Sequence, residues 1–213
     1  MKAVIFDMDG VLVDSEPVIT KAAILALREY GIHAKNEDFH PFTGMGEDRF
    51  IGGVAEKYGI DYQIEMKKRT YEIYVEIVND EIGIYDGISE LLISLRGKGI
   101  RTAVASSADE LKVMANLPAA GIDRALFDII CSGEDVINKK PSPDIFLLAA
   151  KKLQVEPEYC IVVEDALSGI SAALAAGMSC LAISTSFSKE ALLNAGAKEV
   201  FANTKDILPF FKV

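Results

Sequence analysis

The sequence has few cysteines, no excess of basic residues and no long uncharged apolar segment. Its three cysteines, Cys131, Cys160 and Cys180, form no CxxC pair, and we expect buried thiols in strands rather than a metal or redox site. Asp and Glu number 32 against 22 Lys and Arg, a formal net charge of -10. This balance disfavours nucleic acid, whose phosphates need cationic partners. The apolar run ending at Asp7 is too short for a signal sequence or membrane span, so we expect a soluble cytoplasmic protein without nucleic-acid or membrane partners.

Apolar residues, in contrast, are plentiful. They make up 50% of the 213 residues, enough for one core with a smaller accessory domain. Short, nearly continuous apolar runs alternate with amphipathic segments, which is typical of strands buried on both faces of a parallel sheet and covered by helices. The expected strands are Ala3–Phe6, Thr102–Ala105, Phe127–Cys131, Cys160–Val163 and Cys180–Ile183. The expected helices are Ser89–Lys98, Asp109–Ala120, Ser142–Leu153, Ser168–Ala176 and Lys189–Ala195, with Gly99, Gly121, Gly177 and Gly196 as left-handed residues at helix ends. The alternation predicts an α/β fold with a doubly wound parallel sheet.

One stretch departs from this alternation. It has helical periodicity over Pro17–Tyr30, Asp48–Tyr58 and Tyr62–Asn79 and no convincing strand. Because it directly follows the first strand, it would lie over the carboxyl edge of the sheet, where open α/β sheets bind ligands. We therefore predict an α/β core from residues 1–15 and 84–213 and an all-helical cap domain from residues 16–83.

The first strand ends in two carboxylates, in Asp7-Met8-Asp9-Gly10. Residues two apart in an extended segment point to the same side, so Asp7 and Asp9 are expected to face one crevice, and Gly10 allows a sharp turn. Carboxylates this close repel each other unless a cation lies between them. A hard cation such as Mg²⁺ suits oxygen ligands and would let one carboxylate attack phosphorus while the other moves protons. A solvated pair at a strand end is the alternative.

A second strand end offers hydroxyl groups. Ser106 and Ser107 follow Thr102–Ala105 and open a helix. A hydroxyl together with backbone N–H groups at this position suits a phosphate. A serine that simply caps the helix is the alternative.

Two further segments carry charged candidates. Lys140, next to Lys139 and just before Pro141, can act as a point charge on phosphate, unless the two lysines are merely solvated. Glu164 and Asp165 follow the strand Cys160–Val163. They are suited to bind a cation or, alternatively, to cap the next helix.

The residues around these positions resemble a known family. Phe6-Asp7-Met8-Asp9-Gly10-Val11-Leu12-Val13-Asp14-Ser15 is similar to the first motif of the haloacid dehalogenase superfamily, Lys140-Pro141-Ser142-Pro143-Asp144-Ile145-Phe146 to the third, and Val163-Glu164-Asp165-Ala166-Leu167-Ser168-Gly169 to the fourth. Ser106 matches the second. The resemblance covers essentially the whole chain and is nearest to the β-phosphoglucomutase-like branch with a helical cap, which also holds small phosphatases. Gly44–Glu47 and Ser106–Asp109 also resemble the phosphatase-like domain of plant suppressor-of-quenching proteins.

The resemblance implies roles for these residues. Asp7 would form an aspartyl phosphate, and Asp9 would protonate the leaving group and then activate the incoming nucleophile. Ser106 and Lys140 would bind the phosphoryl group, with Gly10 and Ser107 beside them as phosphate-binding residues. Mg²⁺ would rest on Asp7, the backbone carbonyl of Asp9, Asp165, waters and the substrate phosphate, with Glu164 either bound through water or lying behind the direct ligands.

The cap decides between a phosphatase and a mutase, and here the chain departs from true β-phosphoglucomutases. Their hinge His corresponds to Ile19, and a cap Lys corresponds to Thr70, beside Lys67, Lys68 and Arg69. Their Arg for a distal phosphate corresponds to Glu47, which would repel a second phosphate by roughly 1 kcal/mol or more. Hydrolysis of a monophosphate is therefore favoured over mutase activity.

The loop 43–49 is expected to face the site in this family, so Gly44, Gly46, Glu47 and Arg49 are candidate substrate-binding residues, with an ordinary glycine-rich turn as the alternative. Arg49 could take the place of the missing Arg. Neither histidine of the cap, His33 or His40, is expected to be catalytic.

We thus predict a magnesium-dependent phosphatase of a small, sugar-phosphate-like metabolite, a monomer or weak oligomer. A β-phosphoglucomutase-type phosphotransferase and a non-catalytic regulatory module are the alternatives. A module should lack at least one catalytic position. Dehalogenation is disfavoured because it needs neither the acid Asp9 nor metal ligands.

Overall fold

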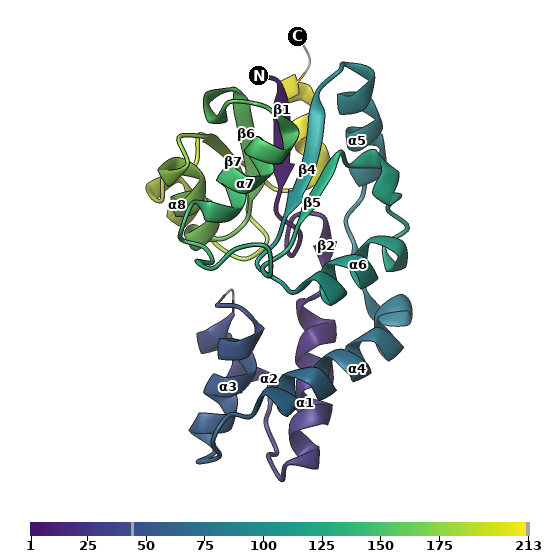
Figure 1. Ribbon diagram of the computed structural model, residues 1–213, viewed down its shortest axis with the longest axis vertical. Coiled ribbons are helices and arrows are strands. Elements are labelled where there is room, and N and C mark those ends of the chain that lie inside the picture. The colour runs from purple at the N-terminus through teal and green to yellow at the C-terminus, as the bar shows by residue number, and fades with distance from the viewer. Residues whose placement is uncertain (44, 212–213) are drawn as a thin grey trace.

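The computed structural model describes residues 1–43 and 45–211, which form two lobes stacked end to end (Figure 1). The larger lobe is built on the strands β1 (Ala3–Phe6), β4 (Arg101–Ala105), β5 (Ile129–Cys131), β6 (Cys160–Glu164), β7 (Ser179–Ile183) and β8 (Glu199–Phe201). They form one parallel sheet in the order β5-β4-β1-β6-β7-β8. The predicted α/β class and doubly wound parallel sheet are confirmed.

Helices cover both faces of this sheet. One face packs against α5 (Ile88–Gly97), α6 (Glu110–Ala119) and η4 (Thr204–Phe211), and the other against α7 (Asp144–Leu153), α8 (Leu167–Ala175) and α9 (Lys189–Asn194). Side chains alternate between the faces along a strand, so Val4 and Phe6 of β1 belong to the first layer, whereas Ala3 and Ile5 belong to the second. This double burial explains why the strands are almost entirely apolar.

Local features of the core agree with the sequence patterns. Gly99, Gly121, Gly177 and Gly196 follow helices and have positive φ, as predicted for residues that end a helix. The three cysteines are buried thiols in β5, β6 and β7 and form no disulfide.

Several short elements were not predicted. β8 has three residues and begins with a charged one, which gave no apolar run to detect. β5 starts at Ile129 rather than Phe127, because a 3₁₀ turn, η2 (Arg124–Leu126), precedes it. The other short 3₁₀ turn in the core is η3 (Pro157–Tyr159).

The smaller lobe is helical and has its own apolar core. Its elements are α1 (Glu16–Glu29), α2 (Asn36–Phe39), η1 (His40–Phe42), α3 (Glu47–Lys57) and α4 (Ile64–Glu81). We call these residues, 16–81, the helical lobe. Its core cluster includes Tyr74, and Ala115 and Ala119 of α6 pack against that cluster. The Tyr74 hydroxyl also donates a hydrogen bond to Asn116 of α6. Figure 1 shows α4 beside α6, so the helical lobe docks on the larger lobe through this helix pair.

The two segments that join the lobes run side by side. β2 (Val13–Asp14) pairs antiparallel with β3 (Gly83–Ile84). A Cβ added at Gly83 would lie 2.8 Å from the Cβ of Asp14, so this close pairing requires glycine. The paired connection holds the helical lobe at the carboxyl ends of the strands, at the opposite end of the larger lobe from the N-terminus (Figure 1). Among the described residues, no helix combines the length and apolarity needed to cross a membrane.

Candidate active site

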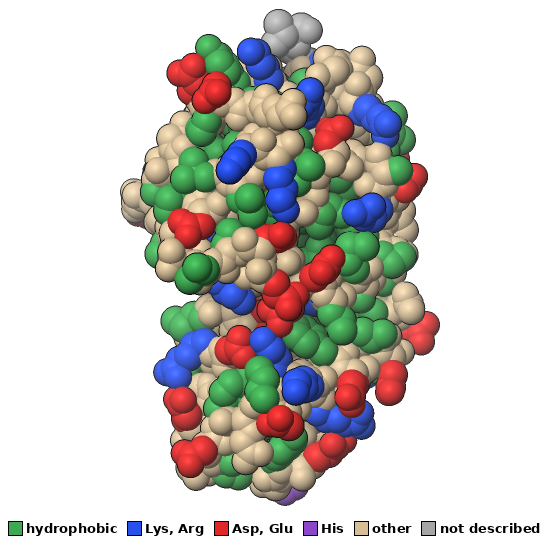
Figure 2. Space-filling view, viewed as in Figure 1, with side chains coloured by type: hydrophobic (Ala, Val, Ile, Leu, Met, Phe, Trp, Pro, Cys, Tyr) green, Lys and Arg blue, Asp and Glu red, His purple; other side chains and the backbone are tan. Residues whose placement is uncertain are grey.

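A cavity of about 960 Å³ lies between the two lobes. The larger lobe lines it with the residues that follow β1, β4 and β6, and the helical lobe lines it with Ile19, Met45 and Phe50 among others. Figure 2 shows acidic and basic side chains gathered along the constriction between the lobes. The cavity has the size of a small-molecule site, and it lies where the strand order reverses around β1, as is common for ligand sites of α/β folds.

Asp7 directly follows β1 and is 7% exposed. Its backbone N–H donates to the carbonyl of Val163 at 2.9 Å, which continues the ladder between β1 and β6. The Lys140 ammonium donates to its carboxylate. Burial raises the pKa of Asp7 from 3.8 to about 7, against the attraction of Lys140 and with added repulsion from Glu164 and Asp9.

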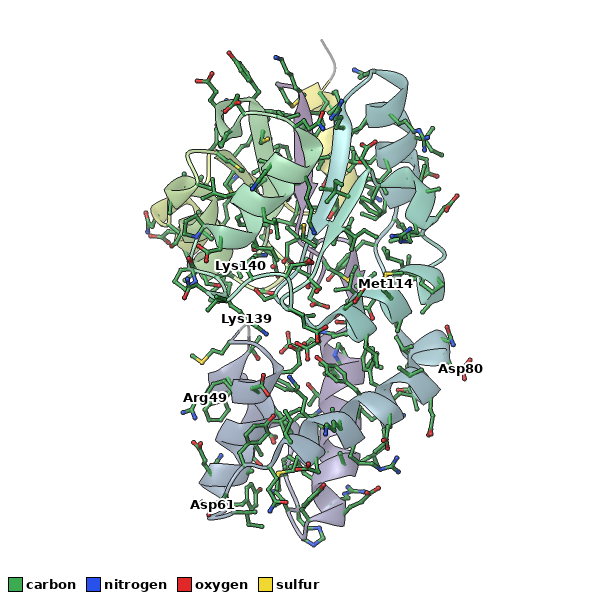
Figure 3. The ribbon with its side chains drawn as sticks, in the orientation of Figure 1. Arg49, Asp61, Asp80, Met114, Lys139 and Lys140 are labelled. Carbon is green, nitrogen blue, oxygen red and sulfur yellow. The ribbon has the colours of Figure 1, made fainter. Side chains whose placement is uncertain are left out.

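Lys140 reaches Asp7 from the loop before α7. Its Nζ also donates to Glu164 Oε1 at 2.8 Å and to the carbonyl of Ala105 at 3.0 Å, and it lies 4.7 Å from the ring centroid of Phe146. Burial alone would lower the pKa of Lys140, but the charges of Asp7 and Glu164 raise it above its ordinary value. The lysine therefore remains an ammonium group inside the site. Lys139 and Lys140 lie at the edge of the larger lobe that faces the helical lobe (Figure 3).

Three carboxylates could hold a metal ion. Asp7, Glu164 and Asp165 are all buried, and each offers an oxygen within 4.8 Å of the others. Burial, together with the charges of Glu164 and Asp7, raises the pKa of Asp165 well above its ordinary value. A cation among them would relieve this repulsion, and an all-oxygen donor set fits a hard divalent ion. Both oxygens of Glu164 already have partners, since Oε2 accepts the N–H groups of Asp165 and Ala166 at 2.8 Å each.

Asp9 lies beyond the strand, just before a turn, and forms an isolated β-bridge with Val13. β1 ends at Phe6, and the carbonyl of Met8 accepts the N–H groups of Leu12 and Val13. The Asp9 carboxylate lines the cavity but is outside the three-carboxylate group. It accepts the Ser15 hydroxyl and lies 3.1 Å from Lys112 Nζ. Asp7 and Asp9 both line this cavity.

Gly10 is in the same turn and lines the cavity. Its φ is +81°, and a Cβ there would lie 2.0 Å from Asp165 Oδ2. Any side chain at this position would displace the carboxylate. Gly10 thus lets the turn approach Asp165 closely.

Ser106 and Ser107 follow β4 and both line the cavity. Ser106 is 1% exposed, and its hydroxyl oxygen accepts the N–H of Ala108 at 3.1 Å. The carbonyl of Ser107 accepts a hydrogen bond from Lys139 at 3.2 Å. The N-cap of α6 is Asp109, so Ser106 is not simply the cap of that helix.

The residues proposed from the loop of the helical lobe separate into two groups. Gly46 and Glu47 line the cavity, as does His40. Arg49 does not line it. Its guanidinium pairs with Glu56 at 2.8 Å and lies 5.1 Å from the ring centroid of Phe42. The Arg49 side chain is on the outer side of α3 (Figure 3). In this position the guanidinium does not line the cavity, as a substitute for the missing distal arginine would have to. Gly44 lies outside the described residues.

Lys112 was not found from the sequence. It belongs to α6, lines the cavity and is 4% exposed. Its Nζ lies 3.1 Å from Asp9 Oδ2 and 3.5 Å from Glu47 Oε1, so it links the two lobes. Burial opposes the charge, but Asp9 and Glu47 raise the pKa of Lys112 above its ordinary value. Nothing in the local pattern distinguished it from a solvated lysine on a helix.

Thr185 and Ser186 were also missed. Both line the cavity; the Ser186 hydroxyl donates to Asp165 Oδ2, and the Thr185 hydroxyl donates to the carbonyl of Gly10 at 2.7 Å. They follow β7, whose strand was predicted, so the rule that sites gather at carboxyl ends of strands could have found them. They hold the Asp165 carboxylate against the turn at Gly10.

The haloacid dehalogenase-like hydrolase model matches residues 1–177. The chain belongs to this family. The predicted family and the prediction that the chain is an enzyme are confirmed by this match.

Relatives differ in how much of their length the chain covers. It is 47% identical over 201 residues to protein SUPPRESSOR OF QUENCHING 1, chloroplastic, of Arabidopsis thaliana; this alignment covers 92% of the chain and 19% of that protein. It is 34% identical over 209 residues to the phosphorylated carbohydrates phosphatase of Thermotoga maritima, covering 92% of each. The crystal structure of CbbY from Rhodobacter sphaeroides in complex with phosphate has a TM-score of 0.84 and 28% identity, covering 97% of this chain and 96% of that chain.

Proposed function

We propose that the chain is a magnesium-dependent phosphatase that hydrolyses a small, sugar-phosphate-like monoester through an aspartyl phosphate on Asp7. The observation that carries the proposal is the position of Asp7, buried beside Glu164, Asp165 and Lys140 at the floor of a cavity shared by both lobes. Two relatives support it. One is named a phosphorylated carbohydrates phosphatase, and the other, CbbY, was crystallised in complex with phosphate.

In the first step a carboxylate oxygen of Asp7 attacks phosphorus. The bond from phosphorus to the ester oxygen breaks, and the leaving alkoxide takes a proton from protonated Asp9. Lys140 and the Ser106 hydroxyl, both at the end of the cavity that holds Asp7, are available to the phosphoryl oxygens.

In the second step water attacks the phosphorus of the aspartyl phosphate. Asp9, now a carboxylate, accepts a proton from this water, and the bond between phosphorus and the Asp7 oxygen breaks. Inorganic phosphate leaves, and the enzyme returns to its starting protonation state. Asp9 suits both roles because its carboxylate lines the cavity and is held by Ser15 and Lys112.

Asp7 and Asp165 are the residues that would hold the metal, with Glu164 acting behind them because both of its oxygens are hydrogen-bonded. When bound, Mg²⁺ supplies positive charge that offsets the crowded carboxylates and the phosphate.

A hydrolysis assay tests the proposal. The protein with Mg²⁺ should release phosphate from p-nitrophenyl phosphate, and Asp7→Asn should reduce the rate by at least roughly 1000-fold because the nucleophile is gone. A panel of phosphorylated metabolites then ranks the substrates by kcat/KM. If the folded protein released no phosphate from any ester, the proposal would fail and a non-catalytic module would be favoured.

The same assay separates hydrolysis from phosphoryl transfer to a sugar. Isomerisation of β-glucose 1-phosphate with a bisphosphate primer would support a mutase. The position of Arg49 outside the cavity and the acidic Glu47 inside it argue against that outcome, because a second phosphate would meet no cation from the loop of the helical lobe.

A further inference from the structure

Glu47 is a buried carboxylate, and one of its oxygens has no hydrogen-bond donor among the residues that the structure describes. It begins α3 in the helical lobe, lines the cavity and is 7% exposed. Oε1 lies 3.5 Å from Lys112 Nζ, but no side chain or backbone group of the described residues donates to Oε2. A buried acceptor without a donor is destabilising, so this atom is suited to accept a hydrogen bond from a molecule in the cavity.

The charges around Glu47 restrict what that molecule can be. Lys112 is shared by two carboxylates, those of Asp9 and Glu47. This cluster therefore has no surplus positive charge. An anionic group would be repelled here, whereas a hydroxyl group could donate to Glu47 without bringing a charge.

The neighbouring walls suit a neutral group. Ile19, Met45 and Phe50 of the helical lobe line the same cavity. Their apolar surfaces can contact the C–H groups of a carbon chain while its hydroxyls reach polar atoms. The cavity of about 960 Å³ exceeds what a phosphate alone would fill.

We propose that Glu47 and Lys112 form a distal subsite that binds a hydroxyl group at the end of the substrate remote from its phosphate. This subsite selects a monophosphate of a polyol or sugar over an analogue with a carboxylate or a second phosphate at that end. The inference rests on the proposed function, because that function defines the substrate as a phosphate ester. Binding of the ligand can nevertheless be measured separately from its hydrolysis. Glu47 and Lys112 are specificity-determining residues, and neither takes part in bond cleavage.

Two ligands that differ only at the remote end provide the test. Sorbitol 6-phosphate and 6-phosphogluconate are both open chains, with a CH₂OH group in one and a carboxylate in the other. Their kcat/KM values are measured with the wild-type protein and Mg²⁺. Their affinities are measured by calorimetry with Asp7→Asn, which cannot form the aspartyl phosphate. We expect roughly tenfold preference for sorbitol 6-phosphate in both measurements, the effect of one partly screened like-charge contact.

Variants assign the preference to Glu47. Glu47→Gln removes the charge at nearly constant shape and should bring the ratio close to one, mainly by improving 6-phosphogluconate. Glu47→Ser is a second neutral variant with the same expectation if the glutamine variant does not fold. The control is Glu56→Gln, which removes one charge from the same helix at an exposed position and should leave the ratio unchanged.

The outcomes are distinguishable. Equal affinities of the two ligands for Asp7→Asn, a preference for 6-phosphogluconate, or a ratio that persists in the folded Glu47 variants would each overturn the distal subsite. A clear affinity preference in a protein that hydrolyses none of the phosphate esters, p-nitrophenyl phosphate and the metabolite panel included, would instead overturn the proposed function and leave the subsite supported.

Discussion

The Nζ of Lys140 lies 2.8 Å from Oε1 of Glu164, although the two residues are 24 positions apart in the sequence. The same ammonium donates to Asp7, so one buried cation joins two of the three carboxylates that could hold a metal. Such a cation offsets carboxylate charge within the protein itself. Removal of the lysine or of either carboxylate therefore leaves a buried charge without its partner.

Lys140→Met should strongly destabilise the metal-free protein. It leaves Asp7 and Glu164 buried without their cation, and removal of one partner of a buried pair costs about 3 to 5 kcal/mol of unfolding free energy. Urea unfolding in EDTA measures this loss. Lys139→Met is the matched control, because the Lys139 side chain is 32% exposed and its loss should cost at most about 1 kcal/mol. Added Mg²⁺ should restore part of the stability of Lys140→Met; equal effects of the two substitutions would contradict this account.

The stability of the metal-free protein should fall as the pH rises from about 4 to 7. Burial raises the pKa of Asp7 from 3.8 to about 7, so in this range the folded state binds a proton that the unfolded state has released. The contribution of Asp7 is greatest below pH 4 and is lost by pH 7, at up to about 1.4 kcal/mol per pH unit.

Comparison with Asp7→Asn isolates this contribution from other titrating groups. The wild-type protein in EDTA should lose stability relative to Asp7→Asn across this pH range, as measured by urea unfolding at each pH. Saturating Mg²⁺ should reduce the difference, because the ion favours the carboxylate form. A difference that does not vary with pH would show that Asp7 is not perturbed as described.

Gly10→Ala should reduce activity far more than stability. The new Cβ would lie 2.0 Å from Asp165 Oδ2, so the carboxylate must move and metal binding should weaken, with at least roughly tenfold loss of kcat/KM at low Mg²⁺. Gly31→Ala is the control, since φ there is +76° with nothing within 4 Å of the added atom. Both variants should lose about 1 kcal/mol of stability from the left-handed backbone. Equal activity of the two would contradict the proposed role of Gly10.

The contact between Lys112 and Glu47 should be energetically coupled. A double-mutant cycle with Lys112→Met and Glu47→Gln, measured by urea unfolding, should give a coupling energy of about 1 to 2 kcal/mol because both groups are buried. The cycle with Arg49→Met and Glu56→Gln is the control. That pair is 2.8 Å apart, but its side chains are 51% and 56% exposed, so its coupling should not exceed about 0.5 kcal/mol. A larger coupling energy for the exposed pair than for Lys112 and Glu47 would mean that Lys112 does not join the lobes in solution.

Local sequence patterns explain why the fold and the main site could be predicted. Strands in a parallel sheet buried on both sides leave a continuous apolar run, and the residue after each run lies at one edge of the sheet. Asp7, Ser106 and Asp165 were found in this way, and Lys140 was found from the residues around it. β8 was missed because three residues with a charge leave no such run.

The amino-acid sequence alone determined the α/β class, the family and the residues at the strand ends, because these depend on local patterns and on a sheet topology that orders strand ends at one edge. Only the tertiary structure decided that Asp9 contacts Lys112 and that, of the two charged candidates in the loop 43–49, Glu47 lines the cavity whereas Arg49 does not. The physical reason is that burial of a charged side chain on a helix depends on which surface packs over it. That surface comes from the other lobe, which is distant in sequence.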